Sequence, residues 1–249
     1  MMKKWWPLLA AGLGVYAIAL FVTAPATLAD GAVQRASQGR LKLAEARGTL
    51  WAGSGQIEVR DAAGRVGLSK RLAWRIRPGD LLRARLRYDV EVGRGSQPFP
   101  LMISWSQIEL ANADIDLPAE ALSLGLPRLG PLELSGELNL KIGHLSIGRG
   151  AVRGDAELQW RTAGSGFSPV WPLGDYELRW DGQGRQGSTT LRTLKGPLEL
   201  RGQGSWAFGR APAFAATADA PPEIRRQIAP LLRMIAVERG EGHFELRLN

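Results

Sequence analysis

Residues 82–92 read LRARLRYDVEV, a stretch in which apolar and charged side chains alternate. A period of two places alternate side chains on opposite faces of a β-strand, so this stretch predicts a strand with one buried face. Similar patterns predict strands at residues 56–60, 72–77, 102–109, 132–142, 156–161, 176–180, 198–208 and 244–248. The 31 glycines mostly punctuate these runs as turns. Together they predict a mainly β fold: a glycine-rich antiparallel meander or β-groove.

Few helices are expected among these strands. Asp116 is placed to cap a short helix at residues 118–122, and apolar side chains on one helical face predict a second helix at 222–236, which Pro230 should kink or restart. The segment 164–175 is rich in glycine and proline and is expected to be an exposed connection. The β-rich part allows a division into two lobes, with the break near residues 111–130.

The first 29 residues have a different character. Lys3 and Lys4 precede an uncharged run from Trp5 to Ala29, whose most apolar part is close to the ~20 residues that span a bilayer core. The leading lysines favour a cytoplasmic N-terminus. We therefore expect residues 1–29 to form a short cytoplasmic N-terminus and a single-pass transmembrane signal anchor, and residues 30–249 to form a periplasmic domain. A cleaved signal peptide is the alternative.

The formal net charge of +8 narrows the range of partners. A basic protein often binds nucleic acid, but export would remove nucleic acid from reach, which leaves anionic membrane headgroups and acidic protein surfaces. Arg83, Arg85 and Arg87 share one face of the strand at 82–92. This arginine face is expected either to be a solvated face that discourages edge pairing or to dock membrane headgroups or an acidic partner.

No arrangement of residues predicts catalysis. The chain has no cysteine, and its two histidines, His144 and His243, lie apart in strand-like patterns without a nucleophile beside them. The acidic group of Glu109, Asp114, Asp116 and Glu120 lacks the spacing of a calcium-binding loop and is expected to be a solvated strand end. The glycines at 182, 184 and 187 form a lone G-x-G-x-x-G that no apolar helix follows, so they predict a hairpin turn. We expect no enzyme activity, cofactor or metal.

Three motifs, in this order, resemble the type II secretion system protein N family (general secretion pathway protein N). They are GTLWAG at 48–53, LAWRIRPGDLL at 72–82, and Pro-Leu-Leu at 230–232 followed by GEGHFELRL at 240–248. The resemblance implies a non-enzymatic accessory component of the inner membrane that supports export of folded proteins across the outer membrane, in contact with other secretion components. The residues that match the family pattern would be structural: Gly48, Trp51, Gly53, Trp74, Pro78, Pro230, Leu231 and Leu232. We expect Trp51 and Trp74 to be buried.

A looser likeness suggests another function. Membrane-anchored β-meanders of this kind resemble the AsmA-like group, which implies a periplasmic module that binds or transfers phospholipid. Such a module needs a long apolar surface, and the alternating strands could supply one.

Overall fold

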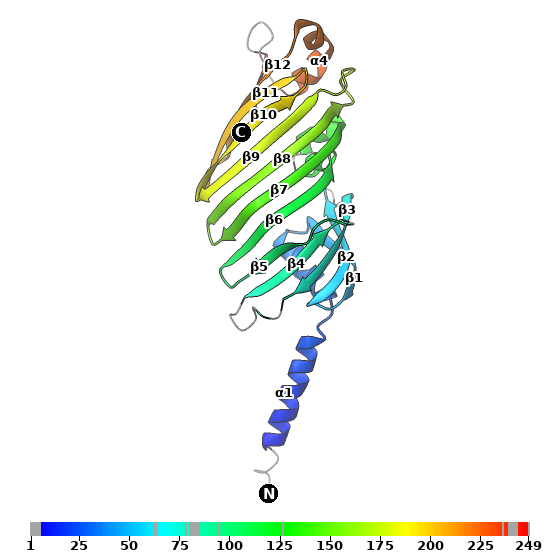
Figure 1. Ribbon diagram of the computed structural model, residues 1–249, viewed down its shortest axis with the longest axis vertical. Coiled ribbons are helices and arrows are strands. Elements are labelled where there is room, and N and C mark those ends of the chain that lie inside the picture. Colours follow the sequence, from blue (N-terminus) through cyan, green and yellow to red (C-terminus); the bar gives the residue numbers. More distant parts are fainter. Residues whose placement is uncertain are drawn as a thin grey trace. The chain divides into compact units, whose positions relative to one another are not determined.

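The computed structural model describes residues 6–61, 64–77, 79, 85–93, 95–125, 127–235, 237–238 and 244–248. The chain forms two compact units (Figure 1). Unit 1 comprises Met1–Ile76 and Val90–Arg94, and unit 2 comprises Arg77–Asp89 and Gly95–Asn249. Residues 111–130, where the sequence allowed a break between lobes, lie within unit 2.

Unit 1 contains two helices and a small antiparallel sheet. The helices are α1 (Trp6–Val22) and α2 (Thr27–Ala36), and the strands, hydrogen-bonded in the order β1-β2-β3, are β1 (Leu41–Gly48), β2 (Ala52–Arg60) and β3 (Val66–Ile76). No helix in the described part of the chain is both long enough and apolar enough to cross a membrane.

The sequence did not predict α2, which runs across the boundary expected between residues 29 and 30. The helix carries Asp30 in its first turn and Arg35 in its last turn, and both charges complement the helix dipole. Asp30 also joins α2 to the sheet, because its Oδ1 accepts a hydrogen bond from the Leu43 backbone N–H at 2.8 Å. A second bond, from the Gln34 amide, lowers the pKa of the Asp30 carboxyl below its usual range, with a smaller contribution from the Leu43 bond. The helix therefore depends on a contact thirteen residues away.

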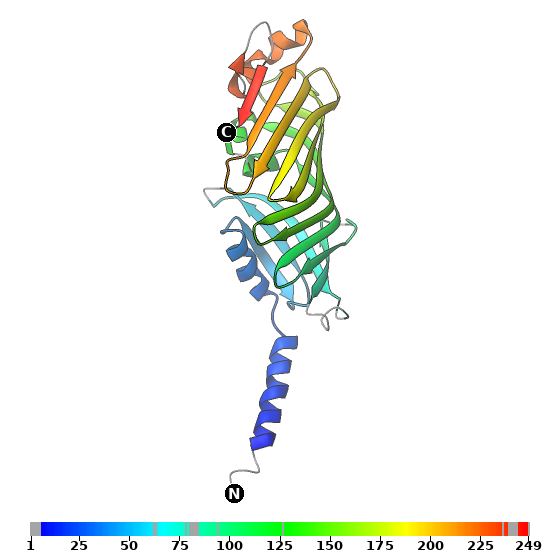
Figure 2. The ribbon, with the colours of Figure 1, turned by 90° about the vertical axis from the view of Figure 1, so that its left-hand side faces the viewer.

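Unit 2 is a larger antiparallel sheet (Figure 2). Its strands are β5 (Phe99–Ile103), β6 (Gln107–Pro118), β7 (Leu134–Gly148), β8 (Ala151–Ser165), β9 (Gly174–Gly184), β10 (Gln186–Lys195), β11 (Glu199–Ala207), β12 (Ala213–Asp219), β13 (Val237–Glu238) and β14 (Phe244–Leu248). Neighbours follow the chain from β5 to β12, after which β14 pairs with β12 and β13 lies beyond it. Strand β4 (Leu86–Val92) contributes residues to both units. The prediction of a mainly β antiparallel meander is confirmed.

Two local predictions were wrong. Residues 102–109 form a hairpin instead of one strand, because Ser104 turns the chain: its backbone N–H donates to the Gln107 carbonyl oxygen at 2.9 Å and its hydroxyl to the same atom at 3.0 Å. The short helix α3 spans Ala121–Gly125 and is followed by the 3-10 helix η3 (Pro127–Leu132). Asp116 does not cap α3, since it stays in β6 and accepts from the Asn139 amide at 2.8 Å.

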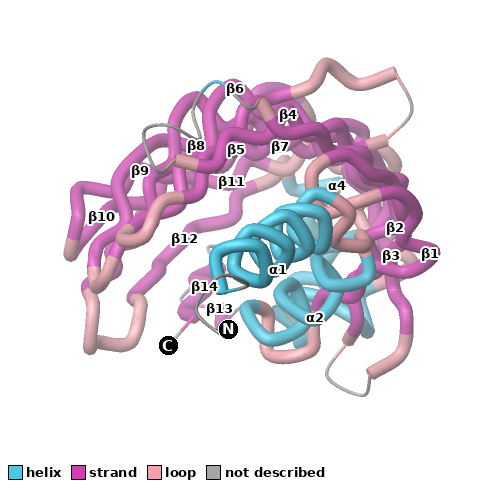
Figure 3. Tube along the Cα trace, turned by 90° about the horizontal axis from the view of Figure 1, so that it is seen from below, coloured by secondary structure: helices cyan, strands magenta, loops and turns pink. Residues whose placement is uncertain are grey.

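Helix α4 (Pro222–Ile235) packs on one end of the unit 2 sheet and confirms the helix expected at 222–236. The strands of this unit follow an arc, and α4 lies on its inner side (Figure 3). The core beneath the helix consists of Leu132, Leu173, Leu198, Ala218, Ala220, Ile228, Leu231 and Leu232. Leu173, only 4 % exposed, corrects the expectation that 164–175 is an exposed connection. Apolar burial pulls part of that segment into the core.

Candidate functional site

The end of α1 is fastened to the connection between β1 and β2. The Trp51 Nε1–H donates to the Phe21 carbonyl oxygen at 2.7 Å, and the two rings lie against each other with centroids 4.4 Å apart. The last carbonyls of a helix have no partner in the next turn. From the described residues, the Phe21 oxygen otherwise receives only a long 3.3 Å bond from the Ala24 N–H. Trp51 therefore supplies a hydrogen-bond donor to a carbonyl oxygen in the last turn of α1.

Backbone bonds reinforce this contact. The Ala26 N–H donates to the Gly48 oxygen at 3.1 Å, and the Leu50 N–H donates to the Ala24 oxygen at 2.8 Å. Pro25 and Thr49 form an isolated antiparallel bridge between the same two segments. We call residues 21–26 and 48–51 together the helix joint. Two short segments thus hold α1 and the sheet of unit 1 together.

Gly48 permits the turn at which β1 enters the helix joint. Its φ of +91° lies in the region that favours glycine, and a Cβ on this residue would stand 2.5 Å from the Ala52 carbonyl oxygen. No other residue type fits both the backbone conformation and the space. The sequence pattern that singled out this glycine therefore has a local steric cause.

Trp74 is hydrogen-bonded to the helix joint. Its ring is 9 % exposed, its Nε1–H donates to the Leu50 carbonyl oxygen at 3.2 Å, and it lies directly opposite Gly53 in the β2–β3 pairing. Trp51, by contrast, is only half-buried and lies in the connection between β1 and β2. The expectation that both tryptophans are buried therefore holds for Trp74 and was wrong for Trp51, because the Trp51 ring covers the end of a helix and not the core.

The arginine face is only partly described. Arg83 and Pro78 lie outside the described residues, whereas Arg85 is exposed just before β4 and Arg87 is half-buried within β4. The Arg87 Nε is shielded from solvent and has no hydrogen-bond partner in the described part of the chain. A docking role for these arginines remains a prediction.

Two residues of the C-terminal motif, Leu231 and Leu232, belong to the core. Leu231 and Leu232 are 4 % and 1 % exposed in the core beneath α4, while Pro230 is exposed within the same helix. The helix continues through Pro230 to Ile235, although proline removes one helical hydrogen bond. Burial of the two leucines thus outweighs a helix-breaking residue between Ile228 and Leu231.

Unit 2 has an apolar face that the individual sequence motifs did not reveal. Across five adjacent strands, β6 to β10, one direct row of paired residues is Ile115, Leu140, Leu158, Leu178 and Leu191. All five side chains are only partly buried. The row continues the face on which α4 packs, since Leu191 is paired with Gly202 and Gly202 with Ala216, two residues before Ala218 of the core. Cross-strand register, which a single sequence does not give, brings these residues together.

The opposite face of the same strands carries charge. Glu177, 3 % exposed, accepts hydrogen bonds from the Nε of both Arg179 and Arg192 at 2.7 Å, and Arg179 also bridges to Glu157 at 3.4 Å. The hydrogen bond from Arg192 and the positive charges of both arginines hold the pKa of the Glu177 carboxyl below its usual range, despite its burial. The sheet is therefore two-sided, with leucines on one face and an ion-pair network on the other.

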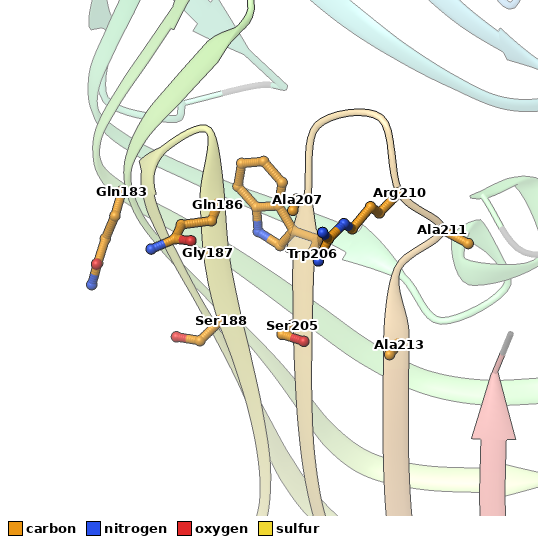
Figure 4. Close-up of a pocket in the computed structure, with 10 residues that line it drawn as sticks. All are labelled: Gln183, Gln186, Gly187, Ser188, Ser205, Trp206, Ala207, Arg210, Ala211 and Ala213. Atoms are coloured by element: carbon orange, nitrogen blue, oxygen red, sulfur yellow. The ribbon is translucent and has the colours of Figure 1, made fainter.

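A cavity of about 520 Å³ lies near the ends of β9 to β12 (Figure 4). Its lining residues are Gln183, Gln186, Gly187, Ser188, Ser205, Trp206, Ala207, Arg210, Ala211 and Ala213. Figure 4 shows the indole of Trp206 directed from β11 toward β10. This ring stacks on Trp180 with centroids 5.8 Å apart. The lining offers amides, hydroxyls and a guanidinium, but no carboxylate or imidazole for acid–base chemistry.

The candidate chemical groups of the sequence do not assemble into a site. Within the residues that the structure describes, no three His, Cys, Asp or Glu side chains are placed to hold a metal ion. His144 is exposed in β7 opposite Asp155, and His243 lies outside the described residues. The glycines at 182–187 form the tight β9–β10 hairpin that was predicted. The features that remain are the helix joint of unit 1 and the apolar face of unit 2.

Comparison with known proteins gives the family. The model of the type II secretion system (T2SS) protein N family matches residues 39–247. No curated protein and no solved structure matches the chain. The matched range includes the first two sequence motifs, nearly all of the third, and both tryptophans of the signature. The chain therefore belongs to the type II secretion system protein N family.

Proposed function

We propose that this protein is a non-enzymatic accessory component of the type II secretion system, anchored in the inner membrane, that supports export of folded proteins across the outer membrane. The family match over residues 39–247 carries this proposal. A structural role is in keeping with the described sites, which consist of packing contacts and ion pairs. The partners would be other components of the secretion system.

The exposed surface of α1 supports the membrane anchor. Large apolar side chains along this helix are 54–70 % exposed at Leu13, Val15, Tyr16, Ile18, Leu20, Phe21 and Val22. Such a surface is costly in water and favourable among acyl chains. Lys3 and Lys4 at one end favour an orientation with the N-terminus in the cytoplasm and residues 30–249 in the periplasm.

Deletion of the gene tests the secretion role. We expect folded exoproteins to accumulate in the periplasm of the deletion strain, and we expect the full chain, supplied in trans, to restore their export. Mass spectrometry of the membrane-extracted chain should show an intact N-terminus if the anchor is retained. Normal export in the deletion strain would contradict the secretion role, whereas a mature chain that begins at Asp30 would contradict only the anchor.

The apolar face of unit 2 favours one alternative, an AsmA-like lipid-binding or lipid-transfer module. A row of one isoleucine and four leucines, all partly buried, runs across five strands and offers a surface for acyl chains. Ile147, which is 45 % exposed, is paired with Val152, six residues before Leu158 in β8, and therefore lies on the same face as Leu158. A photo-crosslinking residue at Ile147 would sample this face, and the same residue at Ser146 samples the opposite face as a matched control. Crosslinks to phospholipid at 147 but not at 146 would support lipid binding. Equal labelling at both positions, or none, would contradict it.

A further inference from the structure

We propose that the end of unit 1 at the helix joint lies in the headgroup layer of an anionic bilayer, with Trp51, Arg47 and Arg75 as its lipid contacts. This interface patch rests on the proposed membrane anchor, and it names the chemistry that the protein would meet where the anchor ends. The patch defines a surface and a partner, anionic phospholipid.

The position of Trp51 carries the first step. Its indole N–H donates to the Phe21 carbonyl and its ring lies against the Phe21 ring, at the end of α1. Phe21 is still 58 % exposed and Trp51 is half-buried, so both rings keep surface available. Tryptophan is enriched where the hydrocarbon core meets the headgroups, because its ring is apolar and its N–H is polar. Trp51 has this arrangement at the point where an apolar helix joins a folded unit.

Charge carries the second step. In the β1–β2–β3 ladders, Arg47 is paired with Ser54 and Arg75 with Ala52. Since Ser54 and Ala52 are two residues apart in β2, Arg47 and Arg75 lie on the same face of the sheet. Both are exposed, and neither guanidinium has an ion pair or a side-chain hydrogen bond with another described residue. Two cations on one face are thus available to phosphate groups.

The backbone brings the tryptophan and the arginines to the same end of the sheet. The Ile76 N–H donates to the Trp51 carbonyl oxygen at 2.6 Å, which places Trp51 beside the residue that follows Arg75. The opposite face of the sheet at this end is occupied by the buried Trp74 ring above Gly53. The arginine-bearing face is therefore the one left open to a partner.

The absence of cysteine makes a direct test practicable. The full chain would be reconstituted into vesicles of phosphatidylethanolamine and phosphatidylglycerol, with a single labelled cysteine at Leu13→Cys in α1, Leu50→Cys in the helix joint or Val66→Cys. Val66 is 52 % exposed at the opposite end of β3, roughly 33 Å from Ile76 at about 3.3 Å per residue. Spin-labelled lipids of known depth would quench each fluorophore.

We expect headgroup-level quenchers to act on the label at position 50, deep quenchers to act on the label at position 13, and neither to act at position 66. Quenching at 13 without quenching at 50 would overturn the interface patch while leaving the anchor intact. Equal quenching at 50 and 66 would also overturn it. Absence of quenching at 13 would instead refute the anchor on which the inference rests, and the inference with it.

The arginines are tested separately from the tryptophan. The chain labelled at Leu50→Cys would be compared in vesicles that contain phosphatidylglycerol and in vesicles of phosphatidylcholine alone, and the emission of the label should shift between the two. Arg47→Gln together with Arg75→Gln should abolish this shift. The matched control is Arg149→Gln with Arg185→Gln, which removes the same charge from two hairpins of unit 2 and should retain the shift. An unchanged shift in the Arg47 and Arg75 variant would overturn the role of these cations.

Discussion

Gly53 lies directly opposite Trp74 in the β2–β3 ladder, and the indole fills the space that a side chain at position 53 would need. A Cβ there would stand 2.5 Å from Cζ2 of the ring and 2.6 Å from the Arg47 carbonyl oxygen. Backbone cannot move aside as a flexible side chain can. The tryptophan and the glycine are therefore one packing unit.

Gly53→Ala should destabilise unit 1, because overpacking of this kind costs about 1–3 kcal/mol. We expect a lower midpoint of thermal unfolding for the detergent-solubilised chain. Gly31→Ala is the matched control: Gly31 lies within α2, a Cβ on this residue would meet nothing within 4 Å, and alanine is the better helix former. A Gly53→Ala variant as stable as the Gly31→Ala variant would contradict the packing argument.

The two signature tryptophans should differ in what they contribute. Trp74→Ala removes a buried ring and should cost about 3–5 kcal/mol of unfolding free energy, with a matching loss of cellular abundance. Trp51→Ala should cost less, because that ring is half-buried and covers the end of α1.

Trp51→Phe separates the ring from its hydrogen bond. Phenylalanine keeps an aromatic ring against Phe21 but cannot donate to the Phe21 carbonyl, so the variant should lose about 1 kcal/mol. Hydrogen exchange at the Leu50 amide, which bonds to the Ala24 oxygen, would report loosening of the helix joint. Exchange at Leu50 that is the same in Trp51→Ala and in the natural chain would show that Trp51 does not hold the joint.

The sequence predicted where the strands lie and which side chains share a face, but not how neighbouring strands are paired. Alternation around Leu140 and Leu178 shows which side chains share a face, since that depends on the period of two alone. It does not show that Leu140, Leu158 and Leu178 are neighbours, because pairing depends on register. The register of β7 against β8 shifts between Ser135 and Glu137 and again between Ile142 and His144, and nothing in the pattern indicates either shift.

The helix joint was only half predictable. The resemblance to the family pattern singled out Trp51, Gly53 and Trp74 as structural residues, and Gly53 and Trp74 do pack against each other. Phe21, the partner of Trp51 in the helix joint, belongs to a segment that the sequence shows only as an apolar run. A hydrogen bond that joins residues thirty positions apart leaves no local signal in either segment.

Helix α4 offers two substitutions with opposite effects. Leu232→Ala should cost about 2–5 kcal/mol, because Leu232 is 1 % exposed and its removal leaves a cavity beside Ile228 and Leu231. Pro230→Ala should stabilise the helix, since Pro230 is exposed and proline denies the helix one hydrogen bond. Thermal unfolding monitored by tryptophan fluorescence would measure both. A destabilised Pro230→Ala variant would show that the ring has a packing role.

Glu177 predicts a pH dependence of stability. The bond from Arg192, helped by the charge of Arg179, lowers the pKa of this carboxyl in the folded state. A carboxyl whose pKa is lower in the folded state than in the unfolded chain stabilises the fold fully above the unfolded value, about 4.3 for glutamate. That contribution is lost as the pH falls through the lower, folded value. The natural chain should therefore lose stability as the pH is lowered below about 4.3.

Glu177→Gln should reduce this dependence as well as the stability near neutral pH, since it leaves Arg179 and Arg192 without their shared carboxylate. The measurement is the thermal midpoint of both proteins between about pH 3 and pH 7, a range that brackets the usual glutamate value. Glu199→Gln is the matched control, because its ion pair with Arg201 is exposed on both sides and exposed pairs contribute little. If Glu177→Gln and the natural chain lost stability in parallel as the pH fell, the acid sensitivity would have to come from other carboxyls.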